Sequence, residues 1–413
     1  MRRAAAASCE DARVSVAGRV RAPRVSAVLR GEEARVTPLE LFFDLVFVLA
    51  ITQCTALIAA QPTWEGLAKG MLVLGVLWWS WVGYAWLTSV VDPEEGVVRI
   101  AIFAAMAALL AAALAVPEAF DSEALTFALA YAVVRVAHIV LFAMASRDDP
   151  LLRRSVAGLA GSTAVGVVLL AAASLADGVL QGALWGVALL LDMAGPYFFG
   201  ADGWTLAPSH FAERHGLIMI IALGESIVAI GVGAEAGVDA GVIAAATLGI
   251  AVAAALWWLY FDVVALVAER RLARAAPGRE RNEMARDSYS YLHFPMVAGV
   301  VLLALGLKKT LGDVGEPLAS IPAVALLGGV ALYLLAHVAF RWRNVHTLSR
   351  QRLVCAVLLV ALVPAALELP ALATLALVTA LLVALIVYEA IRFAEARDRV
   401  RHQLEQEPAP SPS

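Results

Sequence analysis

The chain is poor in charge. Of its 413 residues only 16% are Asp, Glu, Lys or Arg, whereas 62% are hydrophobic and the mean hydropathy is +0.81. Soluble domains carry about 25% charged residues and about 45–50% apolar ones. A soluble globular domain of ordinary composition is therefore excluded.

The sequence also lacks the signatures of several classes of function. Its net charge is -4, so it has no basic excess of the kind that binds nucleic acid. Cys9, Cys54 and Cys355 are too scattered for a disulfide framework or a zinc site. Phosphate-binding Gly-x-x-x-x-Gly-Lys loops, His-Glu-x-x-His zinc motifs and Gly-x-Ser-x-Gly elbows are missing. We expect no nucleic-acid partner, no cofactor and no enzymatic activity.

What the chain has instead is a series of long apolar runs. A spanning helix needs roughly 20 apolar residues to cross about 30 Å of hydrocarbon, and in lipid its backbone must satisfy its own hydrogen bonds. We therefore predict an all-α, polytopic transmembrane helix bundle with the lipid bilayer as its partner. About twelve spans are expected, at 38–60, 66–90, 97–116, 123–146, 152–175, 179–200, 211–233, 238–268, 286–308, 318–341, 350–369 and 371–394.

The distribution of arginine predicts the orientation. Arginines gather at 147–154, 270–281, 341–352 and 397–401, in alternate connections and the C-terminal tail. Lys and Arg are enriched in short cytoplasmic loops, so both termini are expected in the cytoplasm and the protein in the plasma membrane. The polar segments 1–35, which is rich in arginine, and 396–413 are predicted to be disordered tails.

The two halves of the chain share a weak repeat. Placing Glu40 on Glu213 brings Thr52-Gln53 onto Glu225-Ser226 without a gap, and paired tryptophans follow in both halves. Six helices per half would give the halves the same orientation. We predict two tandem, parallel six-helix repeats, at 36–200 and 201–395.

Ionisable residues inside predicted spans are the candidate functional residues, because each costs at least about 2.5–3.5 kcal/mol at the bilayer centre. Glu40 and Asp44 lie four residues apart on one face of the first span. One interpretation is a cation or proton site at the cytoplasmic entrance. The other is charge that complements the helix dipole, which suits Glu40 better than the deeper Asp44.

Glu225 is the sharpest single candidate. It lies near the middle of the seventh span, about 18 Å from Glu213 at 1.5 Å per residue. Arg214, eleven residues before Glu225, falls on nearly the same face. Glu225 is interpreted either as a protonatable or cation-binding carboxylate, or as a structural carboxyl that is neutral or paired with a basic residue.

Three further spans carry buried candidates. Arg135 and His138 share a stripe in the fourth span, and His337 lies in the tenth. These histidines could relay protons, or simply form interhelical hydrogen bonds. Arg135 could instead neutralise Asp44 or Glu225. Asp192 precedes a proline in the sixth span, an arrangement found in transporter sites and in ordinary bundles alike.

The segment from Leu39 to Gln53, Leu-Glu-Leu-Phe-Phe-Asp-Leu-Val-Phe-Val-Leu-Ala-Ile-Thr-Gln, resembles the bacterial low temperature requirement protein A family. The stretch from Glu213 to Ser226 supports the same resemblance, which covers about residues 36–395. The family name implies a role in growth in the cold but no defined molecular activity.

The first span is also similar, more weakly, to the Phe-Ser-Asp motif of a potassium channel family. Phe43 replaces the serine, and Leu217 stands in the second half where Asp44 would align. We expect a transporter or channel for an ion or small solute. The alternatives are a membrane sensor or structural protein without transport and, third, a membrane-embedded enzyme. The sequence fixes neither the solute nor the oligomeric state.

Overall fold

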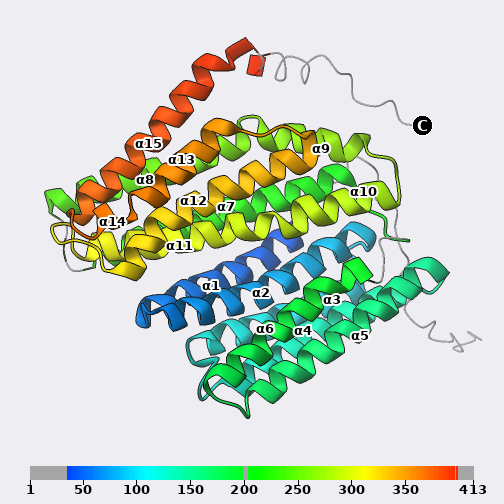
Figure 1. Cartoon of the computed structure of the whole chain (residues 1–413). Coiled ribbons are helices and arrows are strands. Elements are labelled where there is room, and N and C mark those ends of the chain that lie inside the picture. Colours follow the sequence, from blue (N-terminus) through cyan, green and yellow to red (C-terminus); the bar gives the residue numbers. More distant parts are fainter. Residues whose placement is uncertain (1–34, 199–202, 236, 238, 396, 399–413) are drawn as a thin grey trace, which may run out of the picture.

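The computed structural model describes residues 35–198, 203–235, 237, 239–395, 397 and 398, so both predicted tails lie almost entirely outside the described residues. The elements of this part of the chain are helices (Figure 1). In order they are α1 (Pro38–Ala60), α2 (Trp64–Val90), α3 (Gly96–Ala115), η1 (Val116–Glu118), α4 (Ala124–Ala145), α5 (Pro150–Ala173), α6 (Gly178–Phe198), α7 (Pro208–Gly233), α8 (Ala240–Phe261), α9 (Val264–Arg274), α10 (Arg279–Met284), η2 (Ala285–Tyr291), α11 (His293–Gly312), α12 (Ser320–Val345), α13 (Arg350–Ala361), α14 (Val363–Ala366) and α15 (Ala371–Arg392).

Eleven helical segments among the described residues are long and apolar enough to cross a membrane. The predicted span 350–369 is not one of them, because it is interrupted at Leu362, two residues before Pro364. Proline has no N–H for the helical ladder. The chain nevertheless passes through the bundle here: Arg352 contacts Glu389 at one end, and Ala371 donates its N–H to the Glu316 carbonyl at the other.

Two other predicted spans also differ from the observed helices. The segment 238–268 is divided into α8 and α9 at Asp262–Val263. The segment 286–308 begins earlier, with α10, and continues through a π-helical stretch, η2, before α11. π-Helical stretches are rare and often lie at functional sites. The hydrophobic pattern located these helices but did not reveal the change in hydrogen-bond register.

The helices gather in two groups, α1–α6 and α7–α15 (Figure 1). The same neighbours contact in each group: α1 with α2 and α3, and α7 with α8 and α11. Likewise α2 meets α6 and α8 meets α15. In the first group α3, α4, α5 and α6 contact one another in chain order, as do α11, α12, α13 and α15 in the second. The groups meet where α1 and α2 contact α7 and α11. Whether this likeness arose by duplication of 36–200 into 201–395 stays a prediction.

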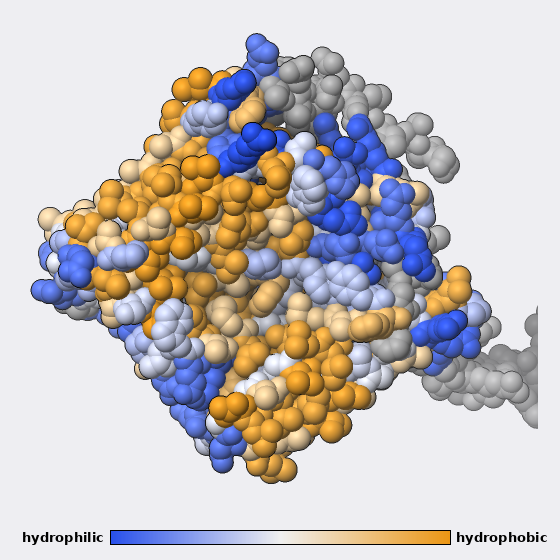
Figure 2. Space-filling view, in the orientation of Figure 1, coloured by the Kyte–Doolittle hydropathy of each residue, from blue (hydrophilic) through white to orange (hydrophobic). Residues whose placement is uncertain are grey.

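The surface matches a lipid environment. Figure 2 shows apolar residues over the middle of the helices on the face drawn, with polar residues gathered toward the ends. Large apolar side chains such as Ile100, Val168 and Leu190 are about two-thirds exposed, whereas Arg135 and Arg214 are among the largest fully buried side chains. A soluble protein would not place arginines inside and so many aliphatic groups outside. The molecule is therefore a multi-pass membrane protein.

Candidate functional site

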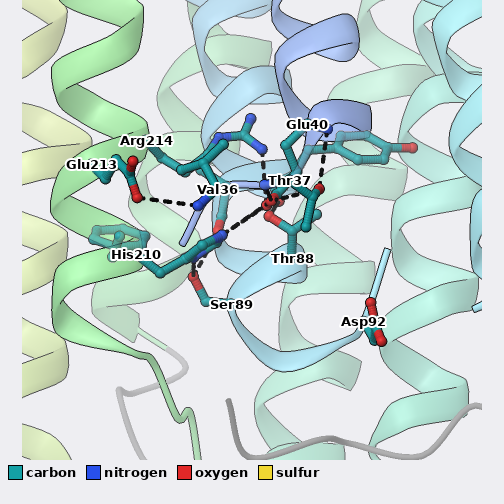
Figure 3. Close-up of polar contacts among 12 residues, drawn as sticks. Val36, Thr37, Glu40, Thr88, Ser89, Asp92, His210, Glu213 and Arg214 are labelled. Atoms are coloured by element: carbon teal, nitrogen blue, oxygen red, sulfur yellow. Dashed lines mark hydrogen bonds and ion pairs between the residues drawn. The ribbon is translucent and has the colours of Figure 1, made fainter. Parts of the chain in front are cut away.

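A cluster of four charged or titratable side chains joins α1 to α7. We call Glu40, Asp44, His210 and Arg214 the α1–α7 cluster. Arg214 places Nη1 3.1 Å from Glu40 Oε1 and Nη2 2.7 Å from Asp44 Oδ1, while His210 Nε2 lies 2.9 Å from Glu40 Oε1. Figure 3 shows Arg214 and His210 reaching from α7 toward Glu40. The helix pair is thus held by charge-assisted hydrogen bonds in a buried environment.

The surrounding residues fix this cluster in place. Thr37 and Glu40 form a capping box at the start of α1, with the Thr37 N–H donating to Glu40 Oε2 at 2.8 Å. Trp81 of α2 donates its indole N–H to Asp44 Oδ1 at 2.8 Å. Glu40 therefore has the structural role at the helix start that the sequence allowed, and also an interhelical one. Asp44 is committed to Arg214 and Trp81.

Glu213, next to Arg214, does not join the cluster. Its Oε2 accepts the backbone N–H of Val36 at 3.1 Å, which ties the chain entering α1 to α7 (Figure 3). Its side chain faces a cavity on the other side of α7, lined also by residues of α8 and α9.

Helices α1 and α7 run parallel and in register. Glu40 contacts Arg214 near their beginnings, and Thr52 Oγ1 donates to Glu225 Oε2 at 2.5 Å farther along. Glu40 and Arg214 are 174 positions apart in the sequence, and Thr52 and Glu225 are 173 positions apart. This separation is therefore nearly constant along the helix pair. This is the offset at which the repeat alignment placed Glu40 on Glu213. Residues that the alignment equated therefore lie at the same level of the bundle.

Glu225 differs from the other buried carboxylates. It is 2% exposed, and no basic side chain of the described residues forms an ion pair with it. The proximity of Arg214 on the helical wheel was misleading, because Arg214 turns toward Glu40 and Asp44. Glu225 accepts a hydrogen bond from the Thr52 hydroxyl and interacts with the Thr55 hydroxyl, both donors without charge, and Lys308 interacts with it electrostatically without forming an ion pair. A carboxyl in such a place can exchange a proton or accept a cation.

Arg135 and Asp192 form a second buried ion pair, within the first group of helices. Arg135 Nη2 of α4 lies 2.9 Å from Asp192 Oδ1 of α6 and 2.6 Å from Thr163 Oγ1 of α5. Tyr131 donates its hydroxyl to Asp192 Oδ2 at 2.7 Å. Arg135 thus neutralises a carboxylate, as one of the two alternatives held, but the carboxylate is Asp192 and not Asp44 or Glu225. Sequence spacing within one helix could not reveal a partner on another.

The two candidate histidines lie apart from each other and from Glu225. His138 packs between Tyr84 and Phe142. His337 stacks on Tyr333, and its Nδ1 accepts from Arg352 Nη1 at 2.8 Å. Among the described residues, no chain of hydrogen bonds joins either histidine to the carboxylates of the α1–α7 cluster.

Two sets of contacts in this interior were not predicted from the sequence, although the sequence does place His293 beside a proline. Arg352 of α13 pairs with Glu389 of α15 at 2.8 Å, which gives the second group of helices its own buried arginine–carboxylate pair. His293 donates Nδ1–H to the Ser288 carbonyl in η2 and accepts the Tyr260 hydroxyl on Nε2 at 2.8 Å. The proline two residues after His293 was the available signal, since it marks a disturbed helix.

The fold and these interior charges define the chain as a polytopic α-helical membrane protein. It belongs to the family described as bacterial low temperature requirement A protein (LtrA), whose pattern it matches over residues 35–387. It is also 30% identical over 308 residues to an uncharacterized protein of Rhizobium meliloti (strain 1021), which covers 71% of this chain and 74% of that protein. No solved structure matches the chain.

Proposed function

We propose that this protein moves an ion or small solute across the plasma membrane, with both termini in the cytoplasm, and that it is not an enzyme. The observation that supports a transport function is the state of Glu225. Charged groups within a membrane protein normally face the bundle interior and pair with one another. Glu40, Asp44 and Asp192 follow that rule, whereas Glu225 is buried and forms no ion pair among the described residues, Lys308 interacting with it only at longer range.

The position of Glu225 supports the same proposal. It lies at the contact of α1 with α7, where the two groups of helices meet. Movement of one group against the other would change the surroundings of this carboxyl first. Transporters built from two halves commonly place their binding sites at such an interface. Glu225 is proposed to be the proton- or cation-binding group, with Thr52 as a supporting ligand.

The alternative, a membrane sensor or structural protein supporting growth in the cold, is favoured by the α1–α7 cluster. Glu40, Asp44, His210 and Arg214 pair with one another across the interface and leave little charge for a solute. Under that hypothesis the buried charges lock α1 against α7, and Glu225 is a neutral carboxyl that adds one hydrogen bond.

Flux measurements on the full-length protein in liposomes discriminate between transport and the sensor or structural alternative. Uptake of protons, monovalent cations and a panel of small organic solutes would be followed for the wild type, Glu225→Gln and Glu235→Gln. Glu235 follows the same helix but is exposed, so it serves as the matched control. We expect flux in the wild type and in Glu235→Gln, and its loss in a folded Glu225→Gln protein.

The outcomes that contradict the proposal are distinct. Absence of flux from the wild type for every solute would refute transport. Undiminished flux in Glu225→Gln would refute the role of this carboxyl. Loss of folded protein on the same substitution would support the structural alternative, and size-exclusion chromatography measures that directly.

A further inference from the structure

A cavity of about 650 Å³ lies among α7, α8, α9 and η2, away from Glu225. We call it the α7–α9 cavity. Its volume falls in the range typical of small-molecule sites. Its walls are mainly apolar and come from Leu217, Ile220, Phe261 and Leu266, among others. Ile220 is 47% exposed, so the apolar wall continues onto the outer surface of the bundle.

Two carboxylates face this cavity, Glu213 from α7 and Glu269 from α9. Both line the same cavity, and each carries a charge of the same sign that the other feels. Neither forms an ion pair with a basic side chain among the described residues. Arg35 also lines the cavity but is exposed, and Arg270 interacts with Glu269 without pairing with it. The interior of the cavity thus carries an excess of negative charge.

A third oxygen points to a ligand. Tyr289 of η2 is 1% exposed and lines the cavity, and its hydroxyl has no hydrogen-bond partner in the described part of the chain. That hydroxyl interacts electrostatically with Glu269 and with Tyr260. Leaving a buried hydroxyl unpaired costs about 1–3 kcal/mol. A ligand that reaches Glu269 could remove this cost.

We propose that the α7–α9 cavity binds an organic ammonium group, either of a free alkylamine or of an amine-bearing lipid headgroup. An ammonium offers three donors, and the cavity offers acceptors on Glu213, Glu269 and Tyr289. The attached alkyl chain would lie along Leu217 and Ile220. An anion would be repelled by the two carboxylates. No group of three or more metal-ligating side chains occurs among the described residues, which favours an organic cation over a bare metal ion.

The proposal is tested by titrating the purified full-length protein with hexylammonium in an uncharged detergent, using isothermal titration calorimetry. Hexanol has the same alkyl chain without the charge and serves as the control ligand. We expect saturable binding of hexylammonium and none of hexanol. Equal binding of the two would overturn the proposal, as would absence of saturable hexylammonium binding.

Substitutions of residues that line the α7–α9 cavity test whether hexylammonium binds there. We expect Glu269→Gln and Glu213→Gln each to weaken hexylammonium binding at least tenfold, and Tyr289→Phe, which keeps the ring, about threefold. Glu118→Gln, an exposed carboxylate in the first group of helices, is the matched control and should leave the affinity unchanged. Unchanged affinity in folded Glu269→Gln protein would overturn the proposal.

A second experiment distinguishes a free alkylamine from an amine-bearing lipid headgroup as the ligand of the α7–α9 cavity. The titration is repeated in nanodiscs of phosphatidylcholine alone and with added phosphatidylethanolamine. Weaker hexylammonium binding in the second preparation assigns the cavity to the lipid headgroup, and equal binding assigns it to a free amine. The binding does not depend on Glu225, so the Glu225→Gln protein should bind hexylammonium normally whether or not the transport proposal holds.

Discussion

Replacing Arg214 by Gln should destabilise the fold more than any other single change in the α1–α7 cluster. Arg214 is 1% exposed and is the cation that contacts both Glu40 and Asp44, themselves 1% and 0% exposed. Its loss leaves two buried carboxylates, with His210 as the remaining basic member of the cluster. Removing one partner of a buried ion pair costs about 3–5 kcal/mol. At about 1.4 kcal/mol per factor of ten, the unfolded fraction should rise roughly 100- to 4,000-fold.

A compensating variant separates the loss of charge balance from the loss of packing. Asp44→Asn combined with Arg214→Gln leaves only Glu40 as an anion, which His210 can still contact at 2.9 Å. Because coupled neighbours show interaction energies of about 0.5–3 kcal/mol, the double variant should be more stable than Arg214→Gln alone. Additive effects of the two substitutions would contradict the electrostatic reasoning.

The assay is equilibrium unfolding in mixed micelles with increasing SDS, followed by tryptophan fluorescence. The ten tryptophans of the chain report on unfolding together, and one of them, Trp81, lies against Arg214, with 5.6 Å from the guanidinium carbon to the ring centroid. Arg154→Gln, on the exposed side of α5, is the control for a general effect of removing an arginine. A stability of Arg214→Gln equal to that of Arg154→Gln would refute the structural role of the cluster.

Two further stability predictions use the same assay. A methyl group on Gly299 would lie 2.5 Å from the Gly329 carbonyl oxygen of α12, so Gly299→Ala should destabilise the fold by about 1–3 kcal/mol. Gly186→Ala is the control, because open space surrounds Gly186 and no measurable loss of stability is expected. Equal stability of the two variants would contradict the close packing of α11 on α12. Trp81→Phe keeps an aromatic ring but removes the donor to Asp44, so a loss of about 2 kcal/mol is expected. No such loss should appear in a protein that already carries Asp44→Ala, which removes the acceptor.

The sequence predicted much of the fold and only part of the candidate site. The first seven spans begin and end within a few residues of the predicted bounds, because each is a single apolar run. Prediction was poorer at Leu362 and at η2, where a proline or a π-helical register changes the backbone without changing the apolar pattern. For the site, Glu40, Asp44 and Arg214 were recognised individually, but their mutual contact was not.

The sequence by itself determined that this is a helical membrane protein of the LtrA family, because apolar run length and a contiguous motif are properties of the chain in one dimension. It also singled out the costly interior charges. Only the tertiary structure decided which charges neutralise one another, since ion pairs such as Arg135–Asp192 join residues far apart in sequence. The same pairing sets Glu225 apart as a buried carboxyl that forms no ion pair in the described part of the chain. Packing of α7 against α8, α9 and η2 likewise created a cavity whose carboxylates, Glu213 and Glu269, no sequence pattern placed together.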